Sequence, residues 1–391
     1  MENKKSSVPK LRFPGFTGAW EQRKLGEVVE RFDNLRIPVT SSKRKRGITP
    51  YYGANGIQDY VQGYTHDGEF VLVAEDGAND LQNYPIHYVN GKVWVNNHAH
   101  VLQGKKDIAD NLFLVNAIKR IKFETYLVGG SRAKLNADVM MKLPIKIPKL
   151  NEQQKLGKYF SRIDSLIALH QRKLEHLKEQ KKGLLQKMFP KNGEVVPEVR
   201  FPGFTDDWEQ RKFEEFATYS GKKNKANLDL EPYAITSNEG FIKQNEAHNE
   251  FGYMKNTDRS AYNIVQPNSF GYNPARINIG SIGYYSGNSD IIVSSLYEVF
   301  KTNADIDDQF LSVWFKSSRF KEWINKLQEG SVRLYFYYDK LSETKIKIPS
   351  FTEQKHIGYF FNQLDFLIAL HQRKLEHLKL MKKGLLQQMF V

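Results

Sequence analysis

Apolar residues recur at alternating steps of four and three positions along two long segments of the chain. This spacing puts them on one face of an α-helix, as in the heptad repeats of coiled coils. A histidine and a lysine interrupt each apolar face, and proline is absent from both segments up to Pro190. We therefore predict two long helices, whose contact positions are Ile163, Ile167, His170, Leu174, Leu177, Lys181, Leu184 and Met188 in the first segment and Leu364, Ile368, His371, Leu375, Leu378, Lys382, Leu385 and Met389 in the second.

The two predicted helices are near copies of each other. Residues 152–189 match residues 353–390 at 26 of 38 positions, and Leu166–Lys178 is identical to Leu367–Lys379. Because a lone helix with one apolar face is poorly stable, each copy is expected to pack against the other. A two-fold axis across the pair would make the helices antiparallel and put the domains that precede them at opposite ends of a rod of about 57 Å. Parallel packing would put those domains side by side, and in a third alternative each helix only completes a local core.

Shorter blocks also recur, and they divide the chain into constant and variable parts. These blocks are Val8–Thr17 with Val196–Thr205, Trp20–Lys24 with Trp208–Lys212, and Ile145–Pro148 with Ile346–Pro349. Between them, residues 25–144 and 213–345 share little beyond a Gly-Ser pair. The constant parts are therefore expected to do the same job twice, and the variable parts to do two different jobs of the same kind.

Strand-like runs rich in aromatic and β-branched residues fill the variable parts, which favours mixed α/β modules. The runs are Glu69–Ala74, Ile86–Val89, Lys92–Val95 and Ala99–Leu102 in the first part and Ser269–Tyr272, Ser281–Tyr285 and Ile291–Phe300 in the second. Asn90 and Gly91, between two of these runs, are typical of a tight hairpin. A helix-like stretch, Asp307–Leu327, follows in the second part.

Both variable parts contain polar side chains that can read base edges and basic side chains that suit phosphates. Asn pairs well with adenine and Arg with guanine, and Lys and Arg also neutralise phosphates. The alternative for each residue is an ordinary role in a turn, at a strand end or in a solvated loop. The candidate DNA contacts are Lys43, Arg44, Lys45, Arg46, Asp76, Asn79, Asn96, Asn97, His98, His100, Arg132 and Lys134 in the first part and Lys222, Lys223, Tyr272, Asn273, Arg276, Asn278, Ser281 and Arg333 in the second.

The net charge of +14 favours a polyanionic partner, although a generically basic protein is the alternative. Residues 1–150 carry 23 Lys and Arg against 15 Asp and Glu, whereas residues 200–391 carry 25 against 23. The absence of cysteine excludes disulfides, thiolate metal sites and cysteine nucleophiles. The polar first ten residues are unlike a secretory signal, and apolar runs stay below the roughly 20 residues that span a bilayer. We therefore expect a cytoplasmic protein without a membrane segment.

Motifs for catalysis are missing from the sequence. There is no phosphate-binding loop of the Walker type and no glycine-rich fingerprint after a clear strand. Asn273-Pro274-Ala275-Arg276 lacks the second proline and the aromatic residue of an amino-methyltransferase motif, and Glu343-Thr344-Lys345 lacks the Pro-Asp of a nuclease. His98 and His100 could be two metal ligands, but no third is evident, so we expect no metal site and no catalytic residue.

The order and wording of the repeats resemble a known family. Each half opens with Arg-Phe-Pro-Gly-Phe and Trp-Glu-Gln-Arg-Lys, closes its variable part with Gly-Ser and Ile-Lys-Ile-Pro, and continues through Glu-Gln into a helix with His-Gln-Arg-Lys-Leu. This arrangement is similar to the specificity subunit of type I restriction–modification enzymes over essentially the whole chain. The amino-acid sequence of the helix looks like that of the firmicute, staphylococcal-type branch of the family.

The resemblance implies an α+β fold in which two globular α/β target recognition domains are separated by a pair of long antiparallel coiled-coil helices, with a pseudo-two-fold internal repeat. It assigns residues 1–150 and 200–351 to the two recognition domains, 151–190 and 352–391 to the helices, and 191–199 to a linker. Each domain would read one half of a bipartite target in double-stranded DNA, and the helices would fix the spacer.

The resemblance also implies partners. Two modification (methyltransferase) subunits would bind the helices and methylate adenine, and restriction (motor–nuclease) subunits would join them. S-adenosylmethionine, ATP and magnesium are expected in those partners, and no cofactor in this chain. The alternatives are a stand-alone DNA-binding regulator and a coiled-coil scaffold without a DNA role.

Overall fold

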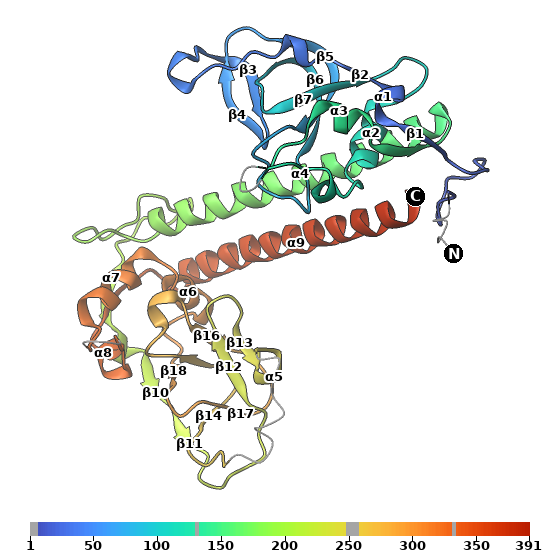
Figure 1. The fold of residues 1–391 in the computed structure, drawn as a ribbon. Helices are drawn as coiled ribbons and strands as arrows, with labels where there is room; N and C mark the ends of the chain where they lie inside the picture. Colours follow the sequence, from blue (N-terminus) through green and yellow to red (C-terminus); the bar gives the residue numbers. More distant parts are fainter. Residues whose placement is uncertain (1–6, 130–132, 248–257, 331–333) are drawn as a thin grey trace. The chain divides into compact units, whose positions relative to one another are not determined.

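A computed structural model describes residues 7–129, 133–247, 258–330 and 334–391 (Figure 1). The chain forms two compact units, each containing one variable region. Unit 1 comprises Met1–Arg172 and Gln372–Val391, and unit 2 comprises Lys173–His371. The two predicted helices are confirmed as α4 (Leu150–Lys187) and α9 (Phe351–Met389). Because each helix contributes its first part to one unit and its last part to the other, both units depend on both helices.

Unit 1 is built around a six-stranded sheet with the strand order β2-β7-β5-β6-β3-β4. All neighbouring strands are antiparallel except β3 and β6. Alternate residues of β5 face different apolar clusters: Val71 and Val73 join the main core with α2, whereas Phe70 and Leu72 join a smaller cluster. The elements of unit 1 before α4 are β1 (Glu21–Lys24), α1 (Leu25–Val28), β2 (Val29–Arg31), η1 (Asp33–Leu35), η2 (Ser41–Lys43), β3 (Arg46–Gly53), β4 (Gly56–Val61), β5 (His66–Ala74), β6 (Ile86–Val95), β7 (Ala99–Gly104), α2 (Asn111–Ile118), η3 (Phe123–Thr125), α3 (Ala137–Met141) and β8 (Pro144–Ile147).

The hairpin predicted at Asn90-Gly91 is wrong. These residues lie within the continuous strand β6, where Asn90 pairs with Glu69 and Gly91 pairs with Gly68 of β5. Both glycines have a positive φ, +90° at Gly91 and +141° at Gly68, so the two strands deform together instead of turning back. Since β6 continues past β5 and pairs with β3, its second half belongs to the same strand as its first.

Besides the β19-β9 pair, the described part of unit 2 contains three smaller sheets, with the orders β10-β18-β15-β16, β11-β14-β17 and β12-β13. The predicted run Ile291–Phe300 is two strands in two sheets, and the predicted helix Asp307–Leu327 is broken where Ser317 caps α7 through the backbone N–H of Phe320. The elements of unit 2 before α9 are β9 (Glu209–Lys212), η4 (Phe213–Glu215), β10 (Ala217–Tyr219), β11 (Lys222–Lys223), β12 (Tyr233–Thr236), β13 (Gly240–Lys243), α5 (Gln244–Ala247), β14 (Asn263–Val265), β15 (Ser269–Tyr272), η6 (Ile277–Ile279), β16 (Ile282–Tyr285), β17 (Ile291–Val293), β18 (Glu298–Thr302), α6 (Asp308–Trp314), α7 (Ser318–Leu327), α8 (Tyr338–Ser342) and β19 (Lys345–Ile348).

The short repeated blocks of the sequence pair with each other. In unit 1, the Glu-Gln-Arg-Lys block is β1 and pairs antiparallel with β8, so that Glu21 faces Ile147. In unit 2, β9 pairs in the same way with β19, so that Glu209 faces Ile348. Each pair joins the beginning of a half to the end of its variable region, so the constant blocks close the variable region between them.

Within each unit the parts of α4 and α9 are antiparallel, as predicted. In unit 1, Lys382 of α9 lies 2.5 Å from Asp164 of α4, while Phe390, directly after α9, contacts the earlier Phe160. In unit 2, Lys181 of α4 pairs with Asp365 of α9. The predicted seam is half-buried at Ile167, His170, Leu184, Ile368, His371 and Leu385 and buried at Ile163, Leu174, Leu177, Met188, Leu364, Leu375, Leu378 and Met389.

The residues directly after the end of each helix complete the core of the unit in which that helix ends. In unit 1, the Phe390 ring packs against Trp20 and stacks on Phe113. In unit 2, the Phe189 ring packs in the same way against Trp208 and Phe310. Since these aromatic rings are buried, each unit needs the end of the helix that begins in the other unit for a complete core.

Candidate nucleic-acid interface

The basic run of unit 1 lies where η2 leads into the β3–β4 ribbon at the edge of the sheet. Lys43, Lys45 and Arg46 are exposed, and none of them has an ion pair among the residues that the structure describes. Arg44 is held differently: its guanidinium lies 4.0 Å from the centre of the Tyr51 ring, and its Nε donates to the Val39 carbonyl. Three of the four predicted phosphate contacts are therefore available to DNA, whereas Arg44 anchors the run to the fold.

A second group of predicted residues follows β5 and precedes β7. Asn97 and Asn79 are exposed, and the Asn79 backbone N–H donates to the Asn55 side chain in the β3–β4 turn. Asp76 and His98 pair with each other and stay partly exposed. The fold thus brings these four side chains and the β3–β4 turn to the same part of unit 1.

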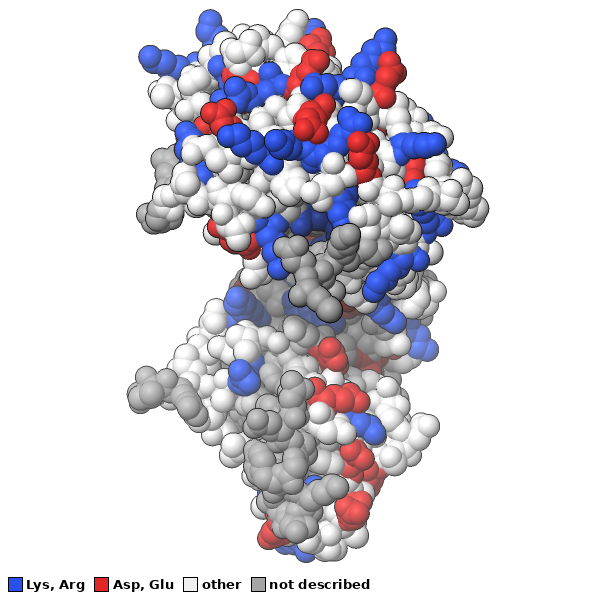
Figure 2. Space-filling model, turned by 45° about the vertical axis from the view of Figure 1, so that its right-hand side comes forward, with Lys and Arg blue, Asp and Glu red and all other residues white. Residues whose placement is uncertain are grey.

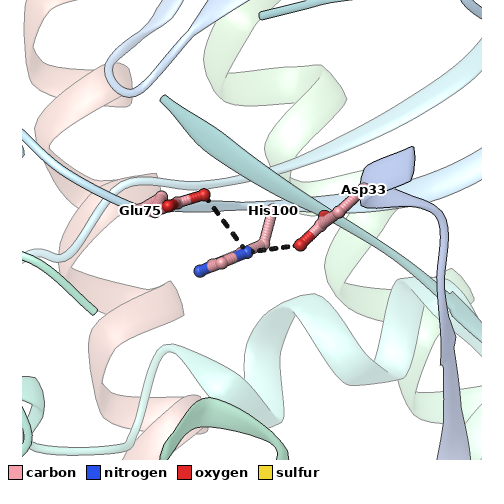
Figure 3. Close-up of side chains that lie close together, drawn as sticks. All are labelled: Asp33, Glu75 and His100. Atoms are coloured by element: carbon pink, nitrogen blue, oxygen red, sulfur yellow. Dashed lines mark hydrogen bonds and ion pairs between the residues drawn. The ribbon is translucent and has the colours of Figure 1, made fainter. Parts of the chain in front are cut away.

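A buried charge network supports this edge, formed by Asp33, Glu75 and His100 (Figure 3). His100 Nδ1 lies 2.7 Å from Asp33 Oδ2 and 3.5 Å from Glu75 Oε2, and its Nε2 lies 2.9 Å from the Leu135 carbonyl. Both ring nitrogens therefore face oxygen atoms of the protein, which fixes the orientation of the imidazole. Arg36 donates to Glu75 over 2.6 Å, so the cluster is held by its own charges.

The electrostatics of the carboxylates agree with this arrangement. Burial raises the pKa of Asp33, but the hydrogen bond with His100 and the charge of Arg36 lower it, and the net pKa lies below its usual value. Burial likewise raises the pKa of Glu75, and hydrogen bonds from Arg36 and Lys134 more than offset it. Lys134, a predicted DNA contact, is half-exposed and lies 2.9 Å from Glu75, so the network also positions a surface cation.

Four predicted DNA contacts are corrected by their burial. Asn96 and His100 are buried in unit 1, where Asn96 accepts from the His98 backbone N–H. In unit 2, Tyr272 is 0% exposed in the core, and the Ser281 hydroxyl donates to the Ile235 carbonyl over 2.7 Å. Because their polar atoms face the protein interior, these side chains cannot touch DNA in this conformation and act as structural supports.

The remaining predicted residues of unit 2 lie around the 3-10 helix η6 and on the strand β11. Arg276 and Asn278 are exposed around η6, and Asn273 stabilises that turn by accepting from the Ala275 backbone N–H. Lys222 and Lys223 are exposed on β11, and Lys223 donates to the Ser295 carbonyl. Arg132 and Arg333 lie outside the described residues.

Charge is unevenly spread over the surface that Figure 2 presents. Lys and Arg side chains gather over unit 1, with Asp and Glu among them, and are sparser over unit 2. The sequence predicted this bias from the excess of basic residues before position 150.

Sequence reasoning missed two kinds of residue. It overlooked Asp33, Arg36 and Glu75, because isolated charges in different segments give no signal until the sheet brings them together. It also overlooked exposed aliphatic residues, of which Ile48 is 94% exposed and Leu296 is 76% exposed. The signal for Ile48 was present, since it follows four consecutive basic residues and a glycine.

Comparison with known proteins identifies the family. The family model described as the type I restriction modification DNA specificity domain matches residues 18–179 and again residues 205–380. The described helices are too short or too polar to cross a membrane.

Related proteins agree with that family model. A type I restriction enzyme specificity subunit of Methanocaldococcus jannaschii is 22% identical over 94% of this chain and 91% of its own length. A specificity subunit of Haemophilus influenzae, described as putative, is 45% identical, with 43% of this chain and 42% of that protein covered.

The fold is also similar to a solved structure. The crystal structure of a type I restriction–modification S subunit from M. genitalium has a TM-score of 0.65 and 15% identity, and the likeness covers 98% of this chain and 99% of that one. With two copies of the domain in the sequence and the matching fold, this chain belongs to the family of type I restriction–modification specificity subunits.

Proposed function

We propose that this chain selects the DNA target of a type I restriction–modification complex, with each variable region reading one half of a bipartite site. The observation that carries the proposal is the occurrence of two DNA specificity domains in one chain. Their constant blocks repeat, whereas residues 25–144 and 213–345 differ, as two readers of different half-sites require. Recognition domain 1 is residues 1–150 and recognition domain 2 is residues 200–351.

The DNA-reading residues that we propose are the exposed ones among the predicted set. In unit 1, Lys43, Lys45 and Arg46 would position phosphates, and Asn79, Asn97 and the Asp76–His98 pair would read base edges. In unit 2 the corresponding groups are the lysine pair of β11 and the exposed side chains of η6. Arg132 and Arg333, beside the Gly-Ser pairs, remain proposed phosphate contacts.

Two modification subunits are the partners proposed for the helices. The identical segments Leu166–Lys178 and Leu367–Lys379 expose the same leucines: Leu166 is 45% and Leu169 is 52% exposed in unit 1, and Leu367 is 39% and Leu370 is 46% exposed in unit 2. A surface that occurs twice in one chain suits two copies of one partner, and exposed leucines suit an apolar interface. The remaining seam residues would hold α4 and α9 together, so that the pair fixes the spacer between half-sites.

Catalysis belongs to the partners in this proposal. Adenine methylation with S-adenosylmethionine would occur in the modification subunits, and cleavage with ATP and magnesium would occur once restriction subunits join. The isolated chain is therefore expected to neither methylate nor cut DNA, and it would act in the cytoplasm with its genomic DNA.

Methylation mapping tests the proposal. The chain is expressed with its modification subunits in a host without adenine methylation, and methylated adenines are mapped across the genome. A bipartite motif is expected, and replacing residues 25–144 with the matching segment of a relative should change one half of it. A regulator or a scaffold would give no methylated motif, and a change in both halves would contradict the assignment of one reader to each half-site.

A further inference from the structure

The β3–β4 ribbon of unit 1 carries a bulge that pushes one apolar side chain into solvent. Arg46 and Thr49 both lie opposite Val61 of β4, so Gly47 and Ile48 are looped out between them. A Cβ on Gly47 would lie 2.3 Å from the Val61 carbonyl oxygen, so only glycine permits this close approach. As a result, Ile48 is 94% exposed, the largest exposed fraction of the large hydrophobic side chains in the described part of the chain.

The surroundings of Ile48 are cationic. Lys45 and Arg46 lie three and two residues before it, Lys43 lies five residues before it, and all three side chains are exposed. Arg44 is held against Tyr51, and this contact anchors the segment that carries the three cations. An exposed isoleucine contributes nothing to the core, while three neighbouring cations without ion pairs among the described residues complement a polyanion.

We propose that the Gly47–Ile48 bulge is a specificity element, in which Ile48 packs on the 5-methyl group of a thymine in the major groove while Lys45 and Arg46 contact the flanking phosphates. The major groove admits a two-stranded β-ribbon, and the thymine methyl is its one apolar feature. Bulges commonly re-aim a side chain away from its strand. This inference rests on the proposed assignment of unit 1 to one half-site.

A cycle of protein and DNA changes tests the contact. The target is first mapped with the wild-type complex, and exchange of residues 25–144 identifies the half-site of unit 1. Duplexes are then made in which each thymine of that half-site is replaced in turn by uracil, which lacks only the methyl group. Binding of the complete complex with modification subunits is measured for the wild type and for Ile48→Ala.

One uracil substitution is expected to weaken binding by the wild type by about fourfold, the effect of one buried methyl group. Ile48→Ala should weaken binding to the thymine duplex by at least as much and should be indifferent to that one uracil. The substitution should leave thermal stability unchanged, because the side chain is almost fully exposed. Gly47→Ala, which forces the bulge to rearrange, should reproduce the loss of thymine preference.

Ile57→Ala is the matched control. Ile57 lies on β4 of the same ribbon and is 48% exposed, but its neighbours Gln58 and Asp59 carry no positive charge. This variant should retain the wild-type preference for thymine over uracil.

Two results would overturn the inference while leaving the proposed function intact: indifference of the wild type to every uracil, or a loss in Ile48→Ala that is equal for thymine and uracil at every position. Failure of the proposed function is separate, because the wild-type complex would then show no bipartite methylated motif at all.

Discussion

The guanidinium of Arg12 forms two parallel hydrogen bonds with the carboxylate of Glu152, at the start of α4. Nε lies 2.7 Å from Oε1, and Nη2 lies 2.7 Å from Oε2. Arg200 and Glu353 repeat the arrangement in unit 2, at 2.8 and 2.7 Å. The pair joins the first repeated block of each half to the first turn of its helix, which gives a structural reason for the recurrence of Arg-Phe-Pro-Gly-Phe and of Glu-Gln.

Arg12→Ala is expected to destabilise unit 1 by about 3 kcal/mol, because it leaves a buried carboxylate without its partner. The Glu152 side chain is only 2% exposed, so water cannot replace the guanidinium. Arg12→Lys should recover only part of the loss, since an ammonium cannot form the bidentate pair. Urea denaturation followed by circular dichroism measures the change, and hydrogen exchange in β1 and β8 locates it.

Arg23→Ala supplies the control for this prediction. Arg23 pairs with Glu21, but the side chains are 36% and 62% exposed, so solvent screens the pair and its loss should cost much less than the loss of the buried pair. Equal losses in Arg12→Ala and Arg23→Ala would contradict a special role for the buried pair.

His66 should make the stability of unit 1 fall on mild acidification. Burial lowers the pKa of His66, and the charge of Arg36 lowers it further. The hydrogen bond to the Phe32 carbonyl and the charge of Asp33 raise the pKa, but it stays below its usual value. Because the unfolded histidine has a pKa near 6.5, stability is fully present above that pH and is lost as the pH falls towards the lower folded-state pKa. We therefore expect the free energy of unfolding to fall as the pH drops from 6.5 towards the folded-state pKa of His66.

The test compares the pH dependence of the wild type with that of His66→Gln. The variant should be less stable at pH 7.5, but its stability should vary less between pH 7 and pH 5. His87, whose pKa is also lowered by burial, remains in both proteins and retains part of the slope. Parallel curves of stability against pH for the two proteins would contradict the prediction, because they would show that folding does not change the protonation of His66.

The exposed basic run should govern the salt dependence of DNA binding. Each phosphate contact contributes about 0.9 to the slope of log K against log salt concentration. Lys45→Ala in the assembled complex should therefore lower the slope by about one and weaken binding to all sequences alike. Arg44→Ala should instead lower thermal stability, because it removes the contact with Tyr51. Fluorescence anisotropy over a range of salt concentrations distinguishes the two outcomes.

The helices were predictable because their signal is local and periodic. Apolar positions at steps of four and three can be recognised within the segment alone, whatever the rest of the chain contains. The near-identity of the two segments favoured an antiparallel pair. Contacts between a helix and a distant element could not be predicted in this way. A Cβ added at Gly157 of α4 would lie 2.5 Å from Asp110 Oδ1 at the start of α2, and the spacing of residues within α4 does not indicate this contact.

The DNA-reading set was less predictable, because burial decides which polar side chains are available. Tyr272 and Arg276 are four residues apart and looked equally suited to DNA, but β15 turns Tyr272 into the core while η6 exposes Arg276. In the same way, Arg44 differs from its three basic neighbours through its contacts with the Tyr51 ring of β3 and the Val39 carbonyl. The assignment to the firmicute branch and the individual DNA contacts remain predictions.

Matched insertions in the two helices test the proposal that the helix pair sets the spacer. One heptad added within Leu166–Lys178 and one within Leu367–Lys379 preserves the seam and lengthens each helix by about 10 Å. Since B-DNA advances 3.4 Å per base pair, the spacer should grow by about three base pairs while both half-sites stay unchanged. Methylation mapping with modification subunits measures the motif directly.

The register of the insertion supplies the control, because length and seam can be varied separately. Insertions of five residues in both helices add a similar length but rotate the apolar stripe, so Leu177 and Leu378 would no longer face the positions that bury them. These variants should lose assembly and methylation altogether instead of shifting the spacer. If the heptad variants stay active with an unaltered spacer, the helices serve only to bind the modification subunits. Bending of the DNA to absorb the added length of about 10 Å would weaken binding. An active complex with an unaltered spacer must therefore hold its half-sites by contacts other than the helix pair.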